Sequence, residues 1–186
     1  LVVEERPSAP LGPNDLRLAV TACGVNYVEG LMVQGRYQVK IPAPFTPGME
    51  VVGRVTEIGP DVTGRRIGER LFVNVGIGGY VDEVVVASHR GVPLPDGLSD
   101  GQAATFMQSY LTGWFALTQR VTTAPGQRML VLGAGGGVGL AAVDIGTARA
   151  DGCRSSSCEG ETRSFMGTTA RNEPSVMALL LLGVVA

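Results

Sequence analysis

A short apolar run followed by a cluster of glycines constrains the fold of this chain more than any other feature. Residues 133–139 read Gly-Ala-Gly-Gly-Gly-Val-Gly and directly follow the apolar run 129–132. Glycines at such a junction let the chain turn sharply, bring its backbone close to a pyrophosphate and pack the next helix on the strand. A helix beginning there directs free amides and the positive end of its dipole at the phosphates. The motif predicts the start of a dinucleotide-binding domain, whose cofactor-binding residues are Gly133, Gly136, Gly137, Val138 and Gly139.

The spacing of these glycines, and the residues that follow them, qualify this prediction. Gly133, Gly136 and Gly139 form a GxxGxxG register rather than the common GxGxxG, and a flexible turn is the alternative interpretation. A βαβ unit needs a second parallel strand, but residues 152–157 read Gly-Cys-Arg-Ser-Ser-Ser. A disordered tail and a shifted reading frame both explain this segment, and both leave the cofactor domain unfinished. The second strand normally carries the residue that reads the ribose, so the sequence does not separate NADP from NAD.

The preceding part of the chain has a different pattern. Apolar runs separated by turn residues predict four short strands, over residues 16–22, 49–59, 70–75 and 80–87. Strands of this length and spacing indicate a partly closed β-barrel, interrupted by one helix from Asn26 to about Val33. Ser99 is a plausible cap for a connector of two helical stretches, 101–108 and 110–120.

Composition narrows the class of protein. With 45% hydrophobic and 17% charged residues, the chain of 186 residues can bury a core. Its net charge of −2 gives no electrostatic reason to expect nucleic acid or a membrane as a partner. Three cysteines form no disulfide framework, so we expect a cytoplasmic protein. No leader segment is recognised at residues 1–10, and the apolar run 177–186 is too short to span a bilayer.

Several motifs occur in an order that resembles one enzyme family. Gly24-Val-Asn26, the stretch 47–71 (PGMEVVGRVTEIGPDVTGRRIGERL), Gly78-Gly-Tyr-Val, the connector 92–117 and the glycine loop resemble the zinc-independent, zeta-crystallin-like quinone oxidoreductases of the medium-chain dehydrogenase/reductase superfamily. The resemblance covers most of residues 14–148. It implies a mixed β and α/β fold: a GroES-like β-barrel domain over residues 1–120, followed by an incomplete Rossmann domain over 121–150. Residues 151–186 would be an aberrant tail. In the family the active site lies between the two domains, and full-length members are expected to be homo-oligomers.

The resemblance also bears on zinc. Zinc-dependent relatives carry a Cys-His pair and a Gly-His-Glu segment where this chain has Asn26-Tyr27 and Gly48-Met49-Glu50. A catalytic zinc needs about three protein ligands, and of these positions only Glu50 keeps a suitable side chain. No metal site is therefore expected. Glu50 is more simply a structural carboxylate, and Cys23 a small buried residue.

By resemblance, the chain belongs to an enzyme in which NADPH delivers hydride to a quinone or a similar small electron-poor acceptor. The implied catalytic residues are Asn26, Tyr37 and Thr112, and Tyr110 would contact the cofactor. Each has a structural alternative, since Asn26 could only cap its helix and Tyr37 could only pack. Two other functions remain open: an enoyl-thioester reductase of the same superfamily, and a non-catalytic fragment. We expect the chain alone to bind NADPH weakly or not at all.

Overall fold

The computed structural model describes residues 1–121, 129–149 and 178–180. The chain divides into two compact units, Leu1–Met107 and Gln108–Ala186. The division falls inside the long connector helix, earlier in the chain than the predicted domain boundary at residue 120. None of the helices in the described ranges is both long and apolar enough to cross a membrane.

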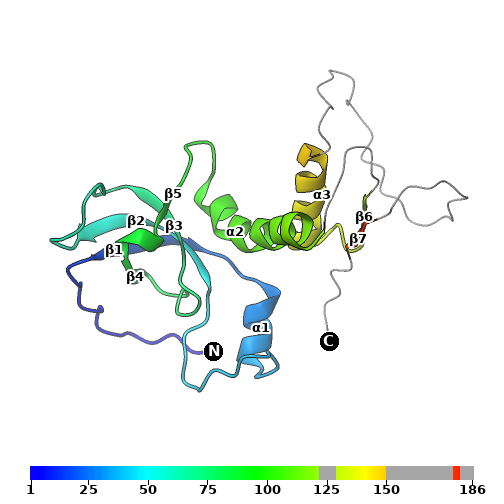
Figure 1. Ribbon diagram of the computed structural model, residues 1–186. Coiled ribbons are helices and arrows are strands. Elements are labelled where there is room, and N and C mark those ends of the chain that lie inside the picture. The colour runs from blue at the N-terminus through cyan, green and yellow to red at the C-terminus, as the bar shows by residue number, and fades with distance from the viewer. Residues whose placement is uncertain (122–128, 150–177, 181–186) are drawn as a thin grey trace, which may run out of the picture. The chain divides into compact units, whose positions relative to one another are not determined.

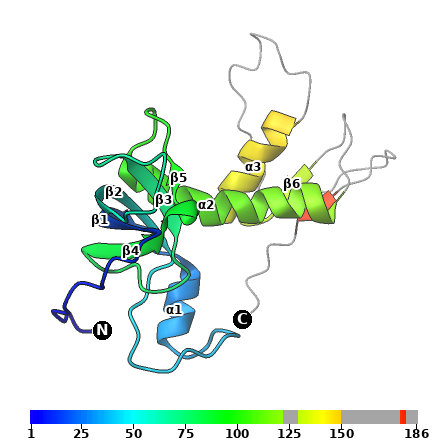
Figure 2. The ribbon, with the colours of Figure 1, turned by 60° about the vertical axis from the view of Figure 1, so that its left-hand side comes forward.

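A five-stranded antiparallel sheet dominates the first unit (Figures 1 and 2). Its order is β4-β1-β2-β3-β5, and its strands are β1 (Asp15–Cys23), β2 (Glu50–Ile58), β3 (Arg70–Asn74), β4 (Glu83–Ala87) and β5 (Val92–Pro93). The four predicted strands are confirmed. The last begins at Glu83 rather than Tyr80, because the Tyr80 amide donates to the Pro47 carbonyl in an irregular turn. The two-residue β5 was not predicted.

The core of this unit is formed by apolar side chains that alternate with other residues along the strands. Leu16 and Leu18 of β1 are fully buried and pack with Val51, Val55 and residues of β3 and β4 in one cluster. A second cluster, on other residues of β2 and β3, includes the connector residues Ala103 and Ala104. Such burial on both sides of a small sheet is the main source of stability in a domain of this kind.

One glycine in the sheet is required by close packing. A Cβ placed on Gly53 of β2 would lie 2.6 Å from the Ala19 carbonyl oxygen of the paired strand β1. Any side chain at this position would push the two backbones apart, so glycine allows the close approach of the strands.

The helices begin after the predicted capping residues, and one helix prediction needs correction. Helix α1 (Tyr27–Val33) begins after Asn26, and the left-handed Gly35 (φ 65°) follows its end. Helix α2 (Asp100–Phe115) begins after Ser99, whose hydroxyl accepts from the Gln102 amide at 3.3 Å. The prediction of two helical stretches was wrong: α2 is continuous across them, and its last turn widens at 116–120. No proline stands in this segment to stop it.

The second unit holds the predicted strand, loop and helix. Strand β6 (Met129–Val131) leads into the glycine loop, and helix α3 (Gly137–Arg149) follows, which confirms their order. Leu117, Ala142 and Ile145 form the one buried cluster recorded for the described residues of this unit. The predicted tail, 151–186, lies outside the described residues except for β7 (Ala178–Leu180), whose backbone pairs in parallel with β6. That pairing was not predicted.

Candidate functional site

Asn26 stands where β1 passes into α1, at the N-cap of the helix. Its backbone N–H donates to Glu29 Oε2 at 2.9 Å, and its side-chain amide nitrogen lies 3.5 Å from Glu29 Oε1. The two residues form a capping box, in which cap and third helical residue satisfy each other's free groups. Asn26 therefore caps α1, and whether it also has a catalytic role stays a prediction.

Several other polar groups surround the Asn26–Glu29 pair. Burial, together with the negative charge of Glu29, raises the pKa of the Cys23 thiol to about 11. The same two causes, in the same order, raise the pKa of Tyr80. Glu50 is fully buried at the start of β2, in agreement with a structural role. These pKa values keep Cys23 and Tyr80 in their protonated forms at neutral pH.

Asn26, Tyr27 and Met49 match zinc-ligand positions through the family resemblance alone, and this match stays a prediction. In the described part of the chain, no three His, Cys, Asp or Glu side chains are grouped so that they could hold a metal ion.

Tyr37 follows α1 at its other end. Its backbone N–H donates to the Leu31 carbonyl at 3.2 Å, in the turn that contains Gly35. Its side chain is half-buried. The structure places Asn26 and Tyr37 in the first unit, whereas Tyr110, Thr112 and the glycine loop belong to the second.

The glycine loop forms a compact turn whose glycines have different physical roles. Gly133 has a φ of 75°, which favours glycine, and its carbonyl accepts from the Gly136 amide at 3.0 Å. A Cβ on Gly139 would lie 2.1 Å from the same carbonyl oxygen, so this position admits no side chain. The fold of the loop itself thus requires Gly133 and Gly139.

Two other glycines of the loop are not required by the fold. A Cβ on Gly135 would have no neighbour within 4 Å, and one on Gly136 would meet only the Gly133 carbonyl oxygen at 3.5 Å. Neither has a positive φ. Both lie on the exposed side of the turn, just before the first-turn amides of α3, which no helical carbonyl can satisfy. A bare backbone at this place suits close approach of an anionic group.

Helix α2 contributes side chains beside this loop. A Cβ on Gly137 would lie 2.8 Å from the Ser109 hydroxyl, so Gly137 leaves room for the serine. The Tyr110 hydroxyl donates to Asp144 Oδ2 of α3 at 2.6 Å, and this bond is the first cause of the raised pKa of Tyr110. Thr112 is exposed on α2. Val138 is half-buried in the first turn of α3.

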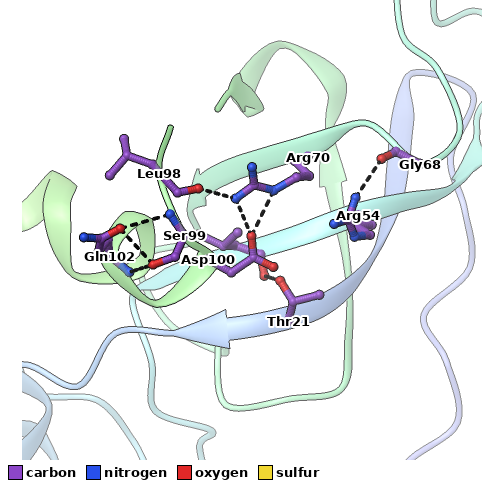
Figure 3. A network of polar contacts seen from close by, with 9 residues as sticks. Thr21, Arg54, Gly68, Arg70, Leu98, Ser99, Asp100 and Gln102 are labelled. Atoms are coloured by element: carbon purple, nitrogen blue, oxygen red, sulfur yellow. Dashed lines mark hydrogen bonds and ion pairs between the residues drawn. The ribbon is translucent and has the colours of Figure 1, made fainter. Parts of the chain in front are cut away.

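An ion pair in the first unit fixes the start of α2 (Figure 3). Arg70 of β3 donates to Asp100 Oδ1 from Nε at 2.9 Å and from a terminal nitrogen at 2.5 Å, and also to the Leu98 carbonyl. A hydrogen bond from Thr21, and then the Arg70 contact, hold the pKa of Asp100 below its usual range. The sheet thereby determines where the connector helix begins.

Sequence reasoning missed three side chains of these sites. Glu29 was given no role, although the spacing Asn-x-x-Glu is a capping-box signal that could have identified its contact with Asn26. Ser109 and Asp144 meet their partners only through the packing of α2 against α3, which no local pattern in the sequence indicates.

Comparisons with known proteins agree with this arrangement. Residues 12–96 match the alcohol dehydrogenase GroES-like domain family. The chain is 39% identical over 147 residues to quinone oxidoreductase-like protein 2 of Bos taurus, a match that covers 79% of this chain and 42% of that protein.

Two solved structures have a similar fold. The quinone oxidoreductase of Thermus thermophilus, solved also in complex with NADPH, has a TM-score of 0.69 and 36% identity, and the match covers 79% of this chain and 46% of that one. The CurK enoyl reductase has a TM-score of 0.69 and 25% identity, covering 78% and 46% of the two chains. The chain thus spans less than half the length of these relatives.

Proposed function

Because residues 12–96 belong to the alcohol dehydrogenase GroES-like domain family, we propose that this chain is part of an NADPH-dependent oxidoreductase that reduces quinones without a metal. The observation that carries the proposal is the bare backbone at Gly135 and Gly136. Neither steric crowding nor a positive φ requires glycine at these two positions. A ligand that approaches the backbone closely would explain why glycine is present.

The second support is the set of side chains at the joint of β1 and α1. Asn26, Tyr27 and Met49 occupy positions at which zinc-dependent relatives hold ligands, and an amide, a phenol and a thioether are poor substitutes for a zinc site. When bound, NADPH would supply the hydride. The chain's own residues would bind and orient the two reactants, with Asn26 and Tyr37 on the acceptor side.

The residues of the second unit would hold the cofactor. The free first-turn amides of Gly137, Val138 and Gly139 would donate to the pyrophosphate. Thr112 is exposed on α2, as contact with the nicotinamide would require, and Tyr110 is fixed by its bond to Asp144. The electron acceptor of the whole enzyme is part of this proposal. The second candidate is an enzyme that reduces an enoyl thioester, and it is supported by the 25% identity to an enoyl reductase.

A chimera tests the cofactor assignment. Residues 1–148 would be joined to the remaining cofactor domain of the Thermus thermophilus enzyme, and NADPH binding and quinone reduction would be measured. We expect both, and we expect Gly136→Val to abolish binding because the side chain would occupy the phosphate's approach. Gly97→Val is the matched control, since a Cβ on Gly97 also has open space but lies outside the loop.

Three outcomes would count against parts of the proposal. A folded chimera that neither binds NADPH nor responds to Gly136→Val would contradict the dinucleotide assignment. Turnover of enoyl thioesters but not quinones would favour the second candidate. One tightly bound zinc per chain in elemental analysis would contradict the metal-free mechanism.

A further inference from the structure

A groove lies between the C-terminal part of α2 and helix α3, which pack against each other in the second unit (Figure 2). A Cβ on Gly113 of α2 would lie 3.2 Å from Ile145 Cδ1 of α3, so glycine allows the close approach of the helices. The groove has a volume of about 420 Å³, which is enough for a small organic molecule. Two aromatic, two aliphatic and two charged residues line it: Tyr110, Trp114, Asp144, Ile145, Ala148 and Arg149.

This groove is separate from the glycine loop. Helix α3 begins at Gly137, and Arg149 is its last residue, about three turns further along. Because each turn rises about 5.4 Å, Arg149 lies roughly 18 Å from the loop along the helix axis. An anionic group bound at the start of α3 would therefore not reach Arg149.

Arg149 provides the groove with a cation that is available to a ligand. Its guanidinium carbon lies 5.5 Å from the centre of the Trp114 ring, within the range of a cation–π contact. Among residues 1–121 and 129–149, it forms no ion pair with a carboxylate. The contact with the ring holds the guanidinium in place, and a carboxylate can accept two N–H donors from such a group.

The other charged residue of the groove, Asp144, does not neutralise Arg149. The Tyr110 hydroxyl donates to Asp144 Oδ2 at 2.6 Å, so this carboxylate already has a donor. Residues three or four positions apart are neighbours on a helix surface, and Arg149 stands at neither spacing from Asp144. The groove thus offers a carboxylate bonded to a tyrosine and, apart from it, a cation stacked on a tryptophan.

A second cation–aromatic pair in the same unit provides a comparison. The guanidinium carbon of Arg120 lies 5.0 Å from the centre of the Phe115 ring. Phe115 and Trp114 are equally exposed, at 49% each. Neither Arg120 nor Phe115 lines the groove. The two pairs therefore have similar chemistry but differ in whether a concave apolar surface lies beside them.

We propose that this groove binds a planar aromatic carboxylate, whose ring packs on Trp114 and Ile145 and whose carboxylate pairs with Arg149. Aromatic and aliphatic side chains favour a flat apolar ring over a polar ligand. The unpaired guanidinium favours an anion over a neutral molecule of the same shape. The proposal is independent of the proposed function, because it involves neither NADPH nor the glycine loop.

Two probes of similar shape test the proposal in the full chain, 2-naphthoate and the neutral 2-naphthalenemethanol. Trp114 is the one tryptophan of the sequence, so a single indole N–H signal in the NMR spectrum of isotopically labelled protein reports on the groove. We expect both probes to shift this signal, and 2-naphthoate to bind about threefold tighter, as for an ion pair near the protein surface. Arg149→Gln should reduce the ratio of the two affinities to about one.

The second cation–aromatic pair supplies matched control variants. Arg120→Gln removes the same charge outside the groove and should leave the ratio unchanged. Trp114→Leu should weaken the binding of both probes about fivefold because ring stacking is lost, whereas Phe115→Leu should not. For these two variants, binding is followed through the NMR signals of the probes themselves.

Four results would overturn the proposal. They are equal affinity for the two probes, no binding of either, a preference for 2-naphthoate that survives Arg149→Gln, and an equal effect of Arg120→Gln. Without a probe, the indole signal should not change with protein concentration. A change would show that a second copy of the chain occupies the groove, and it would also overturn the assignment.

Discussion

The two units of this chain bury their apolar residues in different ways. In Leu1–Met107, five antiparallel strands enclose two buried clusters, although β1 pairs with β4 from far along the chain. In Gln108–Ala186, β6 pairs in parallel with the distant β7, and one small cluster is recorded among the described residues. Antiparallel strands can be joined by short turns, whereas parallel strands need long crossovers. Both units pair segments from far apart in the chain, and they differ in the direction of that pairing and in the size of the buried clusters in their described residues.

The largest expected difference between the units is in the free energy of unfolding that is lost when a buried leucine is replaced by alanine. Leu18→Ala, in the first unit, should lower the free energy of unfolding by about 3 kcal/mol, as for a fully buried leucine. Leu117→Ala, in the second, should cost about 2 kcal/mol, at the lower end of the range for a buried leucine, because the buried cluster around it is smaller. Urea denaturation followed separately in each unit by hydrogen exchange would measure both. Equal losses would contradict the proposed contrast.

A glycine substitution in the second unit tests whether the two units lose stability independently. Gly139→Ala should destabilise the start of α3 by about 2 kcal/mol, since its Cβ would overlap the Gly133 carbonyl. Hydrogen-exchange protection should fall at residues 137–142 and remain unchanged in β1 and β2. Gly30→Ala, whose Cβ would meet no neighbour, is the control and should be neutral or slightly stabilising. Loss of protection throughout the first unit would show that the units are not independent.

A smaller, pH-dependent effect concerns the start of α2. The folded-state pKa of Asp100 is lowered by the Thr21 hydrogen bond and then by Arg70. A lowered pKa contributes stability above the unfolded-state value of about 3.9, and this is lost as the pH falls through the folded value. Asp100→Asn should therefore remove about 1 kcal/mol at about pH 6 and little at about pH 2.5. A constant loss across this range, in chemical denaturation, would assign the effect to packing.

The smallest predicted effect is at the contact between α2 and α3. Tyr110→Phe removes one exposed hydrogen bond and should cost about 0.5 kcal/mol in the second unit only. The pKa of Tyr110, measured by ultraviolet titration, should fall when Asp144 is replaced by Asn, because the carboxylate is the first cause of its increase. An unchanged titration would mean that the hydrogen bond does not persist in solution.

The accuracy of the sequence predictions depends on whether the signal for an element is local. β1, β2 and α1 were predicted because alternation and capping signals are local, and so is the Ser99 cap of α2. The register Met129↔Ala178 could not be predicted, since a parallel pairing across a long intervening segment has no local signature. In the site, the loop glycines were evident, but Asp144 beside Tyr110 depends on helix packing. The burial of Glu29 likewise depends on the surrounding fold rather than on its own helix.

The high pKa of Cys23 has a consequence for chemical durability. Quinones are electrophiles that are attacked by thiolates, and the thiol form reacts far more slowly. With a pKa of about 11, only about one Cys23 side chain in ten thousand is a thiolate at pH 7. Burial, and then the negative charge of Glu29, thus keep this sulfur in the form that is alkylated slowly. The protein could therefore meet many molecules of the proposed acceptor without inactivating itself.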